Sequence, residues 1–186
     1  LRATGGVNTH KGAIFSMGIF CAVMGSMMEE GFGESAFAAR CKALCRDLLR
    51  DFEGLKQKEN ISYGERLYRD YGITGIRGEA AQGFPSVLQV GLPALREGIE
   101  AGKSLNDAAL VALLRLIQAV QDTNILTRSD PQTLQWAQQQ AGKALEQGAG
   151  PEQMRELDRA FTARNLSPGG CADLLALSLF LFFMGR

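Results

Sequence analysis

The chain has 186 residues, of which 46% are hydrophobic, a share that is typical of a globular protein and argues against a disordered one. Its 20 basic residues balance its 20 acidic residues, and a net charge of zero argues against a general nucleic-acid or membrane-surface binder. The most apolar run, from Leu174 to Met184, is too short to cross a membrane. No signal peptide is recognisable, so we expect a cytoplasmic protein with neither a membrane nor a nucleic-acid partner.

Apolar residues recur at helical spacing nearly throughout the chain, and the alternating patterns typical of strands are absent. The first predicted helix covers about residues 12–28. The second is marked by apolar positions from Phe37 to Leu55. The first helix carries small residues that would let another helix approach closely: Ser16, Gly18, Ala22, Gly25 and Ser26.

Capping signals and prolines predict the next two helices. Ser62 and Glu65 have the spacing of a capping box, which begins a short helix that ends near Gly72. A further helix begins at Pro85 and continues to about residue 102, and we expect Pro93 to kink it.

The last four predicted helices have similar start signals. Asp122 is expected to end the first of them, and Asp130 is the expected N-cap of the second. The sequence therefore predicts a single all-α domain over residues 1–186, with roughly eight helices, short loops and no sheet. These four helices begin at Ser104, Pro131, Pro151 and Ser167-Pro168.

The cysteines are expected to be small buried hydrophobic residues rather than metal ligands or disulfide partners. The single histidine of the chain is too few to complete a zinc site with them. A disulfide framework is not expected in a chain of this size and composition. The cysteines are Cys21, Cys41, Cys45 and Cys171.

Four polar clusters lie at predicted helix boundaries. The first places Asn8, His10 and Lys11 before an apolar helix, where free backbone N–H groups and a partial positive charge suit a phosphate. Simple capping by Asn8 or Thr9, with a solvated Lys11, is an equal alternative.

The second cluster contains Thr74, Arg77 and Glu79, separated by glycines. Arg77 can hold phosphate oxygens with two N–H groups at once, and Glu79 is a candidate metal ligand or general base. The alternative is a surface ion pair between Arg77 and Glu79, which would contribute little stability.

The third cluster contains Asp122, Asn124, Thr127 and Arg128. Asp122 is expected to close an apolar helix, where the helix dipole disfavours a negative charge. A carboxylate in such a position indicates a nearby cation, metal or reacting proton, and we favour this interpretation over a structural hydrogen bond. Asp130 needs no role beyond capping.

The fourth cluster leads into the last helix. Gly169 and Gly170 put bare backbone at a helix N-terminus, which suits an anion, and Asp173 follows within one turn. The alternatives are structural: Asn165 as a helix-terminating residue, Ser167 as a cap and Asp173 as a favourable first-turn carboxylate.

Together these clusters resemble the triphosphoribosyl-dephospho-CoA synthase family. The resemblance covers residues 3–184, the C-terminal two-thirds of the family's chain. Because chains of this family begin well upstream, we expect an N-terminal segment that this sequence lacks, and hence a partner that supplies it or a homo-oligomer. The matching stretches are GVNTHKGAIFS (6–16), YGITGIRGEA (71–80), DTNILTR (122–128) and NLSPGGCADLL (165–175).

The resemblance implies an enzyme with ATP and 3′-dephospho-CoA as substrates. Such an enzyme transfers the triphosphoribosyl group of ATP to the 2′-hydroxyl of dephospho-CoA and releases adenine. The product is the precursor of the prosthetic group on an acyl carrier subunit of citrate lyase or malonate decarboxylase.

The resemblance also suggests roles for the clusters. Cleavage of the adenine–ribose bond passes through an oxocarbenium-like state, for which Glu79 and Asp122 are the candidate catalytic residues, with Asp173 behind them. Mg²⁺ is expected to help neutralise the triphosphate, with Glu79, Asp122 or Asn124 as ligands. The candidate substrate-binding and phosphate-binding residues are Asn8, His10, Lys11, Thr74, Arg77, Asn124, Arg128, Asn165, Ser167, Gly169, Gly170 and Asp173.

Two other functions fit the same residues. One is a helical hydrolase similar to ADP-ribose glycohydrolases, which would cleave a similar bond with water as the acceptor. The other is a nucleotide-binding helical domain without turnover.

Overall fold

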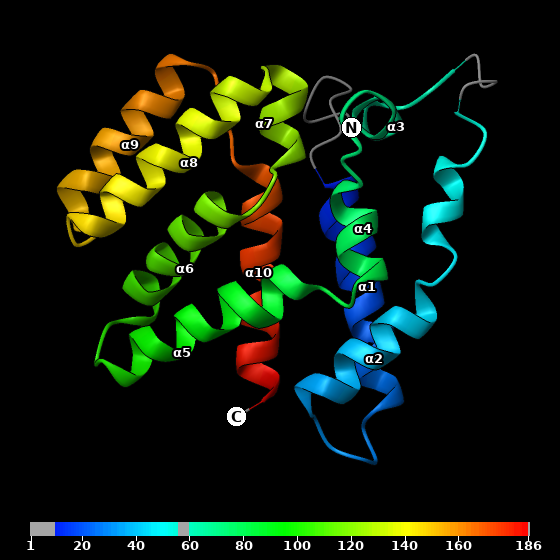
Figure 1. Cartoon of the computed structure of the whole chain (residues 1–186). Coiled ribbons are helices and arrows are strands. Elements are labelled where there is room, and N and C mark those ends of the chain that lie inside the picture. The colour runs from blue at the N-terminus through cyan, green and yellow to red at the C-terminus, as the bar shows by residue number, and fades with distance from the viewer. Residues whose placement is uncertain (1–9, 56–59, 186) are drawn as a thin grey trace.

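A computed structural model describes residues 10–55 and 60–185 of the chain, and in these ranges it contains helices and loops but no strand (Figure 1). The predicted all-α class is confirmed, with ten α-helices in the described ranges rather than roughly eight. None of the helices within those ranges is long and apolar enough to span a membrane. The α-helices are α1 (Lys11–Ser26), α2 (Glu34–Leu44), α3 (Tyr63–Tyr71), α4 (Gly75–Ala81), α5 (Leu92–Glu100), α6 (Leu105–Ala119), α7 (Thr123–Arg128), α8 (Pro131–Glu146), α9 (Pro151–Ala163) and α10 (Gly169–Met184).

The two helices that the sequence does not predict are α4 and α7. They have seven and six residues, which is too short for a repeating apolar pattern. Helices of this length are not stable alone, so packing against the rest of the protein stabilises them. Both lie inside polar clusters that mark helix boundaries in the sequence.

The helices form two groups with α10 between them (Figure 1). One group contains α1, α2 and α4, and the other contains α5, α6, α8 and α9. The helix α10 contacts α1 from the first group and α5 and α6 from the second, and it also contacts α7. A single cluster of buried apolar residues extends through both groups. The junction of the two groups is where the site described below is found.

The second predicted helix ends earlier than expected, at Leu44 instead of Leu55. A short 3₁₀ helix, η1 (Leu48–Phe52), follows it. In this short helix the Phe52 ring stacks on Tyr68 of α3 with a centroid distance of 4.3 Å. The apolar residues after Leu44 therefore cover α3 and α4 instead of extending α2.

Three of the four cysteines are buried, as predicted, but Cys21 is exposed on α1. All four are free thiols. The prediction for Cys21 is wrong because α1 is apolar on all sides, so its sequence pattern does not reveal which face is covered.

The helix predicted to begin at Pro85 is interrupted by a π-helical turn, η3 (Val87–Gly91), directly before α5. Pro93, which was expected to disturb the helix, lies in the first turn of α5 and has no N–H to donate to the preceding turn. At Gly91 the backbone passes so close to α10 that an added Cβ would lie 2.1 Å from the Ser178 hydroxyl. The irregular turn thus brings α5 against α10.

Most predicted caps are confirmed. Ser62 and Glu65 form both hydrogen bonds of a capping box at the start of α3. The Ser104 hydroxyl accepts the Asp107 N–H at the start of α6. The expectation for Ser167 is wrong, because the N-cap of α10 is the following proline and no side chain caps this helix.

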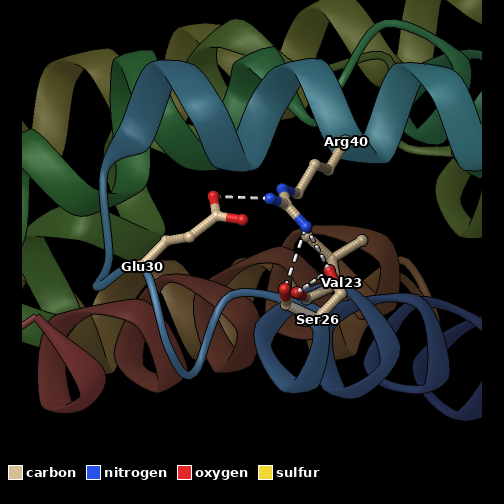
Figure 2. Close-up of polar contacts among 4 residues, drawn as sticks. All are labelled: Val23, Ser26, Glu30 and Arg40. Atoms are coloured by element: carbon tan, nitrogen blue, oxygen red, sulfur yellow. Dashed lines mark hydrogen bonds and ion pairs between the residues drawn. The ribbon is translucent and has the colours of Figure 1, made fainter.

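A single arginine of α2 holds the end of α1 (Figure 2). The Arg40 guanidinium donates to the Ser26 carbonyl at 2.9 Å and to the Ser26 hydroxyl at 3.0 Å, and it pairs with Glu30 at 2.6 Å. A carbonyl in the last turn of a helix lacks an intrahelical partner, which this side chain supplies. The contact joins α2 to the end of α1.

Candidate functional site

A cavity of about 420 Å³ lies at the junction of the two helix groups. This volume is in the lower part of the range for small-molecule sites, roughly 300–1,000 Å³, and suits one nucleotide-sized ligand. Its walls come from α1, α4, the connection between α6 and α7, and α10. The described residues that line it are Lys11, Gly12, Gly72, Ile73, Thr74, Gly75, Ile76, Gly78, Glu79, Gln82, Ser86, Ala119, Val120, Gln121, Asp122, Thr123, Asn124, Gly170, Asp173 and Leu174.

Five helical segments begin at this cavity. Lys11 opens α1, Thr74 precedes α4, Ser86 lies in the first turn of the segment that leads to α5, Asp122 precedes α7, and Gly170 lies in the first turn of α10. The first turn of a helix has unpaired backbone N–H groups and a partial positive charge. Because several helix N-termini converge at the cavity, their N–H groups and partial positive charges can stabilise carboxylates there. The same arrangement suits a bound anion.

Asp122 does not lie where the sequence placed it. Helix α6 ends at Ala119, and Asp122 is the N-cap of α7. Its Oδ1 accepts the N–H groups of Asn124 and Ile125 at 2.8 and 3.3 Å, and its Oδ2 accepts the Cys171 N–H at 2.8 Å. The argument from an unfavourable helix dipole is therefore wrong, because a carboxylate is favoured at a helix N-terminus. Asp122, which is 2% exposed, joins the first turns of α7 and α10.

Glu79 of α4 is half-buried at the cavity wall. Ser86 donates two hydrogen bonds to its carboxylate, one from the hydroxyl and one from the backbone N–H at 3.2 Å. Burial raises the pKa of Glu79, and the two hydrogen bonds from Ser86 oppose this change. A carboxyl group with a raised pKa in a cavity is a candidate for proton transfer at neutral pH.

A strained turn places Ser86 opposite Glu79. Gly83 and Phe84 both have positive φ angles, 76° and 58°. The left-handed region is unfavourable for a bulky residue such as phenylalanine. The Phe84 side chain is fully buried against Phe20, and this packing maintains the turn.

Asp173 is the third carboxyl group of the cavity. Its Oδ2 lies 3.0 Å from the position that a Cβ atom would occupy at Gly12, so the first turn of α1 passes close to this carboxyl group. Burial raises the pKa of Asp173, the charge of Asp122 raises it further, and His10 partly opposes the change. The first turns of α1 and α10 are therefore close together at the cavity.

The side chains of Thr74 and Asn124 pack directly against the backbone of Gly78 and Gly169. An added Cβ at Gly78 would lie 1.9 Å from the Thr74 hydroxyl, and one at Gly169 would lie 2.8 Å from the Asn124 amide nitrogen. Thr74 and Asn124 are thus positioned by close contact with bare backbone.

Seven of the predicted site residues line one cavity although they come from all four sequence clusters. Within the described lining, Lys11 is the one cationic side chain, beside three carboxyl groups. His10 lies close enough to Asp173 to influence its charge state. The seven are Lys11, Thr74, Glu79, Asp122, Asn124, Gly170 and Asp173.

The two predicted arginines are not part of this lining. Arg77 forms an ion pair with Asp51 at 3.4 Å, and its guanidinium lies 5.4 Å from the centre of the Phe52 ring. Arg128 is exposed at the end of α7.

Three other predicted residues are also absent from the lining. Asn165 has a φ of 52° after the end of α9, the left-handed conformation of a helix-terminating residue. Gly169 directly precedes the lining residue Gly170, and Ser167 lies three positions before it. Asn8 lies outside the described residues.

Sequence reasoning missed four polar residues of the lining: Gln82, Ser86, Gln121 and Thr123. Two of them had a recognisable signal: Thr123 lies inside the stretch DTNILTR, and Ser86 follows the proline that begins a helix. The two glutamines stand in no motif. Their position in the cavity depends entirely on how the helices pack.

A protein-built metal cage is not found in the described part of the chain, where no group of three or more histidine, cysteine or acidic side chains could hold an ion. Asp122 has three of its roughly four acceptor positions occupied by backbone N–H groups, and Glu79 has two occupied. Glu79 therefore has more capacity than Asp122 to contact a cation.

Comparison with known proteins relates the whole chain to one family. Residues 1–186 match the family described as ATP:dephospho-CoA triphosphoribosyl transferase. The chain is 42% identical over 187 residues to the 2-(5''-triphosphoribosyl)-3'-dephosphocoenzyme-A synthase of Pectobacterium atrosepticum, covering 98% of this chain and 61% of that protein. No solved structure matches the chain.

Two further relatives carry the name probable 2-(5''-triphosphoribosyl)-3'-dephosphocoenzyme-A synthase. The protein of Citrobacter koseri is 40% identical over 187 residues, covering 97% of this chain and 62% of its own length. The protein of Photobacterium profundum is 40% identical over 194 residues, covering 100% of this chain and 61% of its own length. The chain thus spans about three fifths of the length of the curated relatives it matches.

Proposed function

We propose a transferase activity for this chain because it belongs to the ATP:dephospho-CoA triphosphoribosyl transferase family. In the proposed reaction the bond between C1′ of the ATP ribose and adenine breaks, and adenine leaves. The 2′-hydroxyl oxygen of 3′-dephospho-CoA bonds to the same carbon and loses its proton, and the departing adenine takes up one proton. The triphosphate stays on the transferred ribose. We further propose that the reaction takes place in the cytoplasm and supplies the prosthetic-group precursor for an acyl carrier subunit of citrate lyase or malonate decarboxylase.

The observation that carries this proposal is the convergence of helix N-termini and carboxyl groups at one cavity. A triphosphate needs N–H donors and positive charge. The oxocarbenium-like state at C1′ needs nearby negative charge, and the attacking hydroxyl needs a base. In the cavity, backbone N–H groups and Lys11 are available to the triphosphate. Three carboxyl groups are available to supply the negative charge and the base.

We assign separate roles to the three carboxyl groups. Glu79, whose pKa is raised by burial, removes the proton of the attacking hydroxyl. Asp122 supplies negative charge toward the sugar and keeps the first turns of α7 and α10 in position. Asp173 is the second candidate base, since its pKa is also raised, with burial the largest cause.

The phosphates are assigned to Lys11 and to the first turns of the helices, together with Thr74, Asn124 and Gly170 of the lining. His10, next to Asp173, is close enough to contribute positive charge. Arg77 and Arg128 receive no phosphate in this assignment because they lie outside the cavity lining.

We propose that Mg²⁺ enters with the triphosphate, since this ion is commonly held by one or two carboxylates together with substrate phosphates. Glu79 fits that arrangement better than Asp122, whose oxygens accept three backbone N–H groups. When bound, the ion would neutralise phosphate charge.

The test is to incubate the chain with ATP, Mg²⁺ and 3′-dephospho-CoA and to weigh the products by mass spectrometry. We expect adenine and a dephospho-CoA adduct that carries the triphosphoribosyl group, in equal amounts. Free triphosphoribose instead of the adduct would indicate a hydrolase. ATP binding without adenine release would indicate a binding domain without turnover, and either result would reject the transferase.

A further inference from the structure

Helix α4 carries three kinds of polar side chain along the cavity. Thr74 is its N-cap, Glu79 lies in its second turn and Gln82 is its C-cap, and all three line the cavity. With a rise of about 1.5 Å per residue, Glu79 lies about 7 Å beyond Thr74, and Gln82 lies about 4–5 Å beyond Glu79. A hydroxyl, a carboxyl and an amide therefore follow one another from the start of the helix to its end.

Helix α10 also lines the cavity and runs in the same direction as α4 (Figure 1). The start of α7 touches the first turns of both helices. Thr123 lies 3.0 Å from the position that a Cβ atom would occupy at Gly75, and Asp122 lies 3.1 Å from the corresponding position at Gly170. Because Asp122 and Thr123 are adjacent in the chain, α4 and α10 begin level with each other.

The aromatic core gives the same alignment farther along the two helices. The ring of Phe84, which follows the end of α4, and the ring of Phe180 of α10 both pack against Phe20. Their centroid distances from the Phe20 ring are 4.8 and 6.0 Å. Positions equally far from the starts of α4 and α10 therefore lie at a similar depth in the cavity, where depth is the distance from the helix starts.

The lining residues of α10 also change in character with depth. Gly170 lies in the first turn, where free N–H groups suit an anion. Asp173 comes next, and the apolar Leu174 lies about 6 Å beyond Gly170. Leu174 is therefore about as deep as Glu79 of α4, and Gln82 lies deeper than both.

Helix α6 runs along α10 in the opposite direction. Leu116 and Ser178 both contact Gly91, at the position that a Cβ atom would occupy there. Farther along the chain, the Asp122 carboxylate accepts the Cys171 N–H at 2.8 Å. The end of α6 therefore lies between these two levels of α10.

The end of α6 adds apolar wall at the depth of Leu174. Ala119 and Val120 stand at the end of this helix, and both line the cavity. The part of the cavity away from the helix starts, here called the far end, is thus apolar on the side of α6 and α10. On the side of α4 it has the amide of Gln82.

The order of groups along the cavity matches the order of groups in ATP. In the proposed function, on which this inference rests, the triphosphate binds at the helix starts and C1′ of the ribose lies at the carboxyl groups. The base attached to C1′ then extends toward Leu174 and Gln82. We propose that the far end of the cavity is the subsite for the adenine ring of ATP, and that Gln82 recognises the amino group of the ring.

The chemistry of the far end suits this base. The faces of a purine ring can lie against Ala119, Val120 and Leu174, since ligand sites combine apolar walls with a few polar groups that fix orientation. A glutamine side chain can accept a hydrogen bond from the N6 amino group of adenine and donate one to N7. Guanine has the acceptor O6 in place of that amino group, so the oxygen of the Gln82 amide would lack a donor. The subsite therefore favours ATP over GTP.

Purine ribonucleoside triphosphate tests the role of Gln82, because it differs from ATP only by the missing amino group. Binding of each nucleotide with Mg²⁺ is measured calorimetrically in the absence of dephospho-CoA. The natural chain should bind ATP about 3–10-fold more tightly, the size expected for one hydrogen bond. Gln82→Leu keeps the bulk of the side chain but removes the amide, so it should bind both nucleotides with equal affinity.

Two other glutamines provide controls. Gln89→Leu should keep the preference for ATP, because Gln89 is an exposed residue of η3 outside the described cavity lining. Gln121 is the other glutamine of that lining, and Gln121→Leu should keep the preference as well. A preference that survives Gln82→Leu, or one that is lost in Gln121→Leu, would overturn the proposal. Equal binding of the two nucleotides by the natural chain would also overturn it.

These binding measurements involve no transfer step, so the subsite and the transferase can fail separately. Loss of the preference in Gln82→Leu would support the subsite even in a protein that hydrolyses ATP or only binds it. Normal formation of the dephospho-CoA adduct, together with an unchanged preference in Gln82→Leu, would reject the subsite alone. Because Gln82 is exposed, its substitution should leave the melting temperature nearly unchanged, which separates lost recognition from lost folding.

Discussion

Glu79→Gln is expected to slow adenine release by about 10²–10⁴-fold, the usual contribution of a general base. Glutamine keeps the shape of the side chain and can still accept a hydrogen bond from Ser86, but it cannot remove a proton. The rate is measured as adenine released from ATP in the presence of 3′-dephospho-CoA. Glu97→Gln is the matched control, because Glu97 is an exposed carboxylate paired with Arg115 at 2.7 Å. Comparable turnover of both variants would remove Glu79 from the mechanism.

The same variant should be more stable than the natural chain at neutral pH. Burial raises the pKa of Glu79 in the folded state above its unfolded value of about 4.3. Its contribution to the free energy of unfolding is therefore full below that unfolded pKa and is lost as pH rises through the folded pKa. Glutamine does not ionise, so the advantage of the variant should disappear in acid. A stability loss at neutral pH that persists at pH 3 would show a packing defect instead.

Asp122→Ala is expected to reduce the free energy of unfolding by about 3 kcal/mol, because an N-cap contributes about 1 kcal/mol and a buried donor left unpaired costs about 1–3 kcal/mol. The donors concerned are the N–H groups of Asn124, Ile125 and Cys171. Chemical denaturation measures the loss. Asp130→Ala is the control, since Asp130 caps α8 at an exposed position and should cost only about 1 kcal/mol. Equal losses would contradict the joining role of Asp122.

The substitution Asp122→Asn distinguishes the structural hydrogen bonds of Asp122 from the effect of its negative charge. Asparagine can keep the bonds to the first turn of α7, so most of the fold should be retained. If the carboxylate charge stabilises the transition state, kcat should fall by at least about 10²-fold, the size of effect seen for a lost stabilising group. Unchanged kcat in a folded Asp122→Asn protein would leave Asp122 with a structural role alone.

Helix starts were predicted well from the sequence where the signal depends on residues that are close together in the chain. The Ser62–Glu65 capping box, the Asp130 cap and the proline starts depend on neighbouring residues only, and the structure confirms them. The apolar periodicity of α6 and α8 was equally readable, because each has at least four turns.

The site was predictable only in part, because its geometry depends on short elements and on packing. Asp122 was assigned to the wrong end of a helix, since α7 has six residues and gives no periodic signal. The composition of the second cluster suggested that Arg77 and Glu79 act together, yet they face different surroundings: Arg77 pairs with Asp51, and Glu79 bonds to Ser86. No sequence rule reveals which side of a seven-residue helix faces a cavity.

The central claim is that the triphosphate of the substrate binds at the cavity where the helix N-termini converge. Its most direct test is the affinity for inorganic triphosphate with Mg²⁺, measured calorimetrically for Lys11→Gln and Arg128→Gln. We expect Lys11→Gln to raise Kd by about 10–100-fold, the loss of a charge-assisted hydrogen bond, and Arg128→Gln to change it by less than about twofold. An unchanged Kd for Lys11→Gln, or an equal loss in Arg128→Gln, would place the phosphates elsewhere and contradict the account.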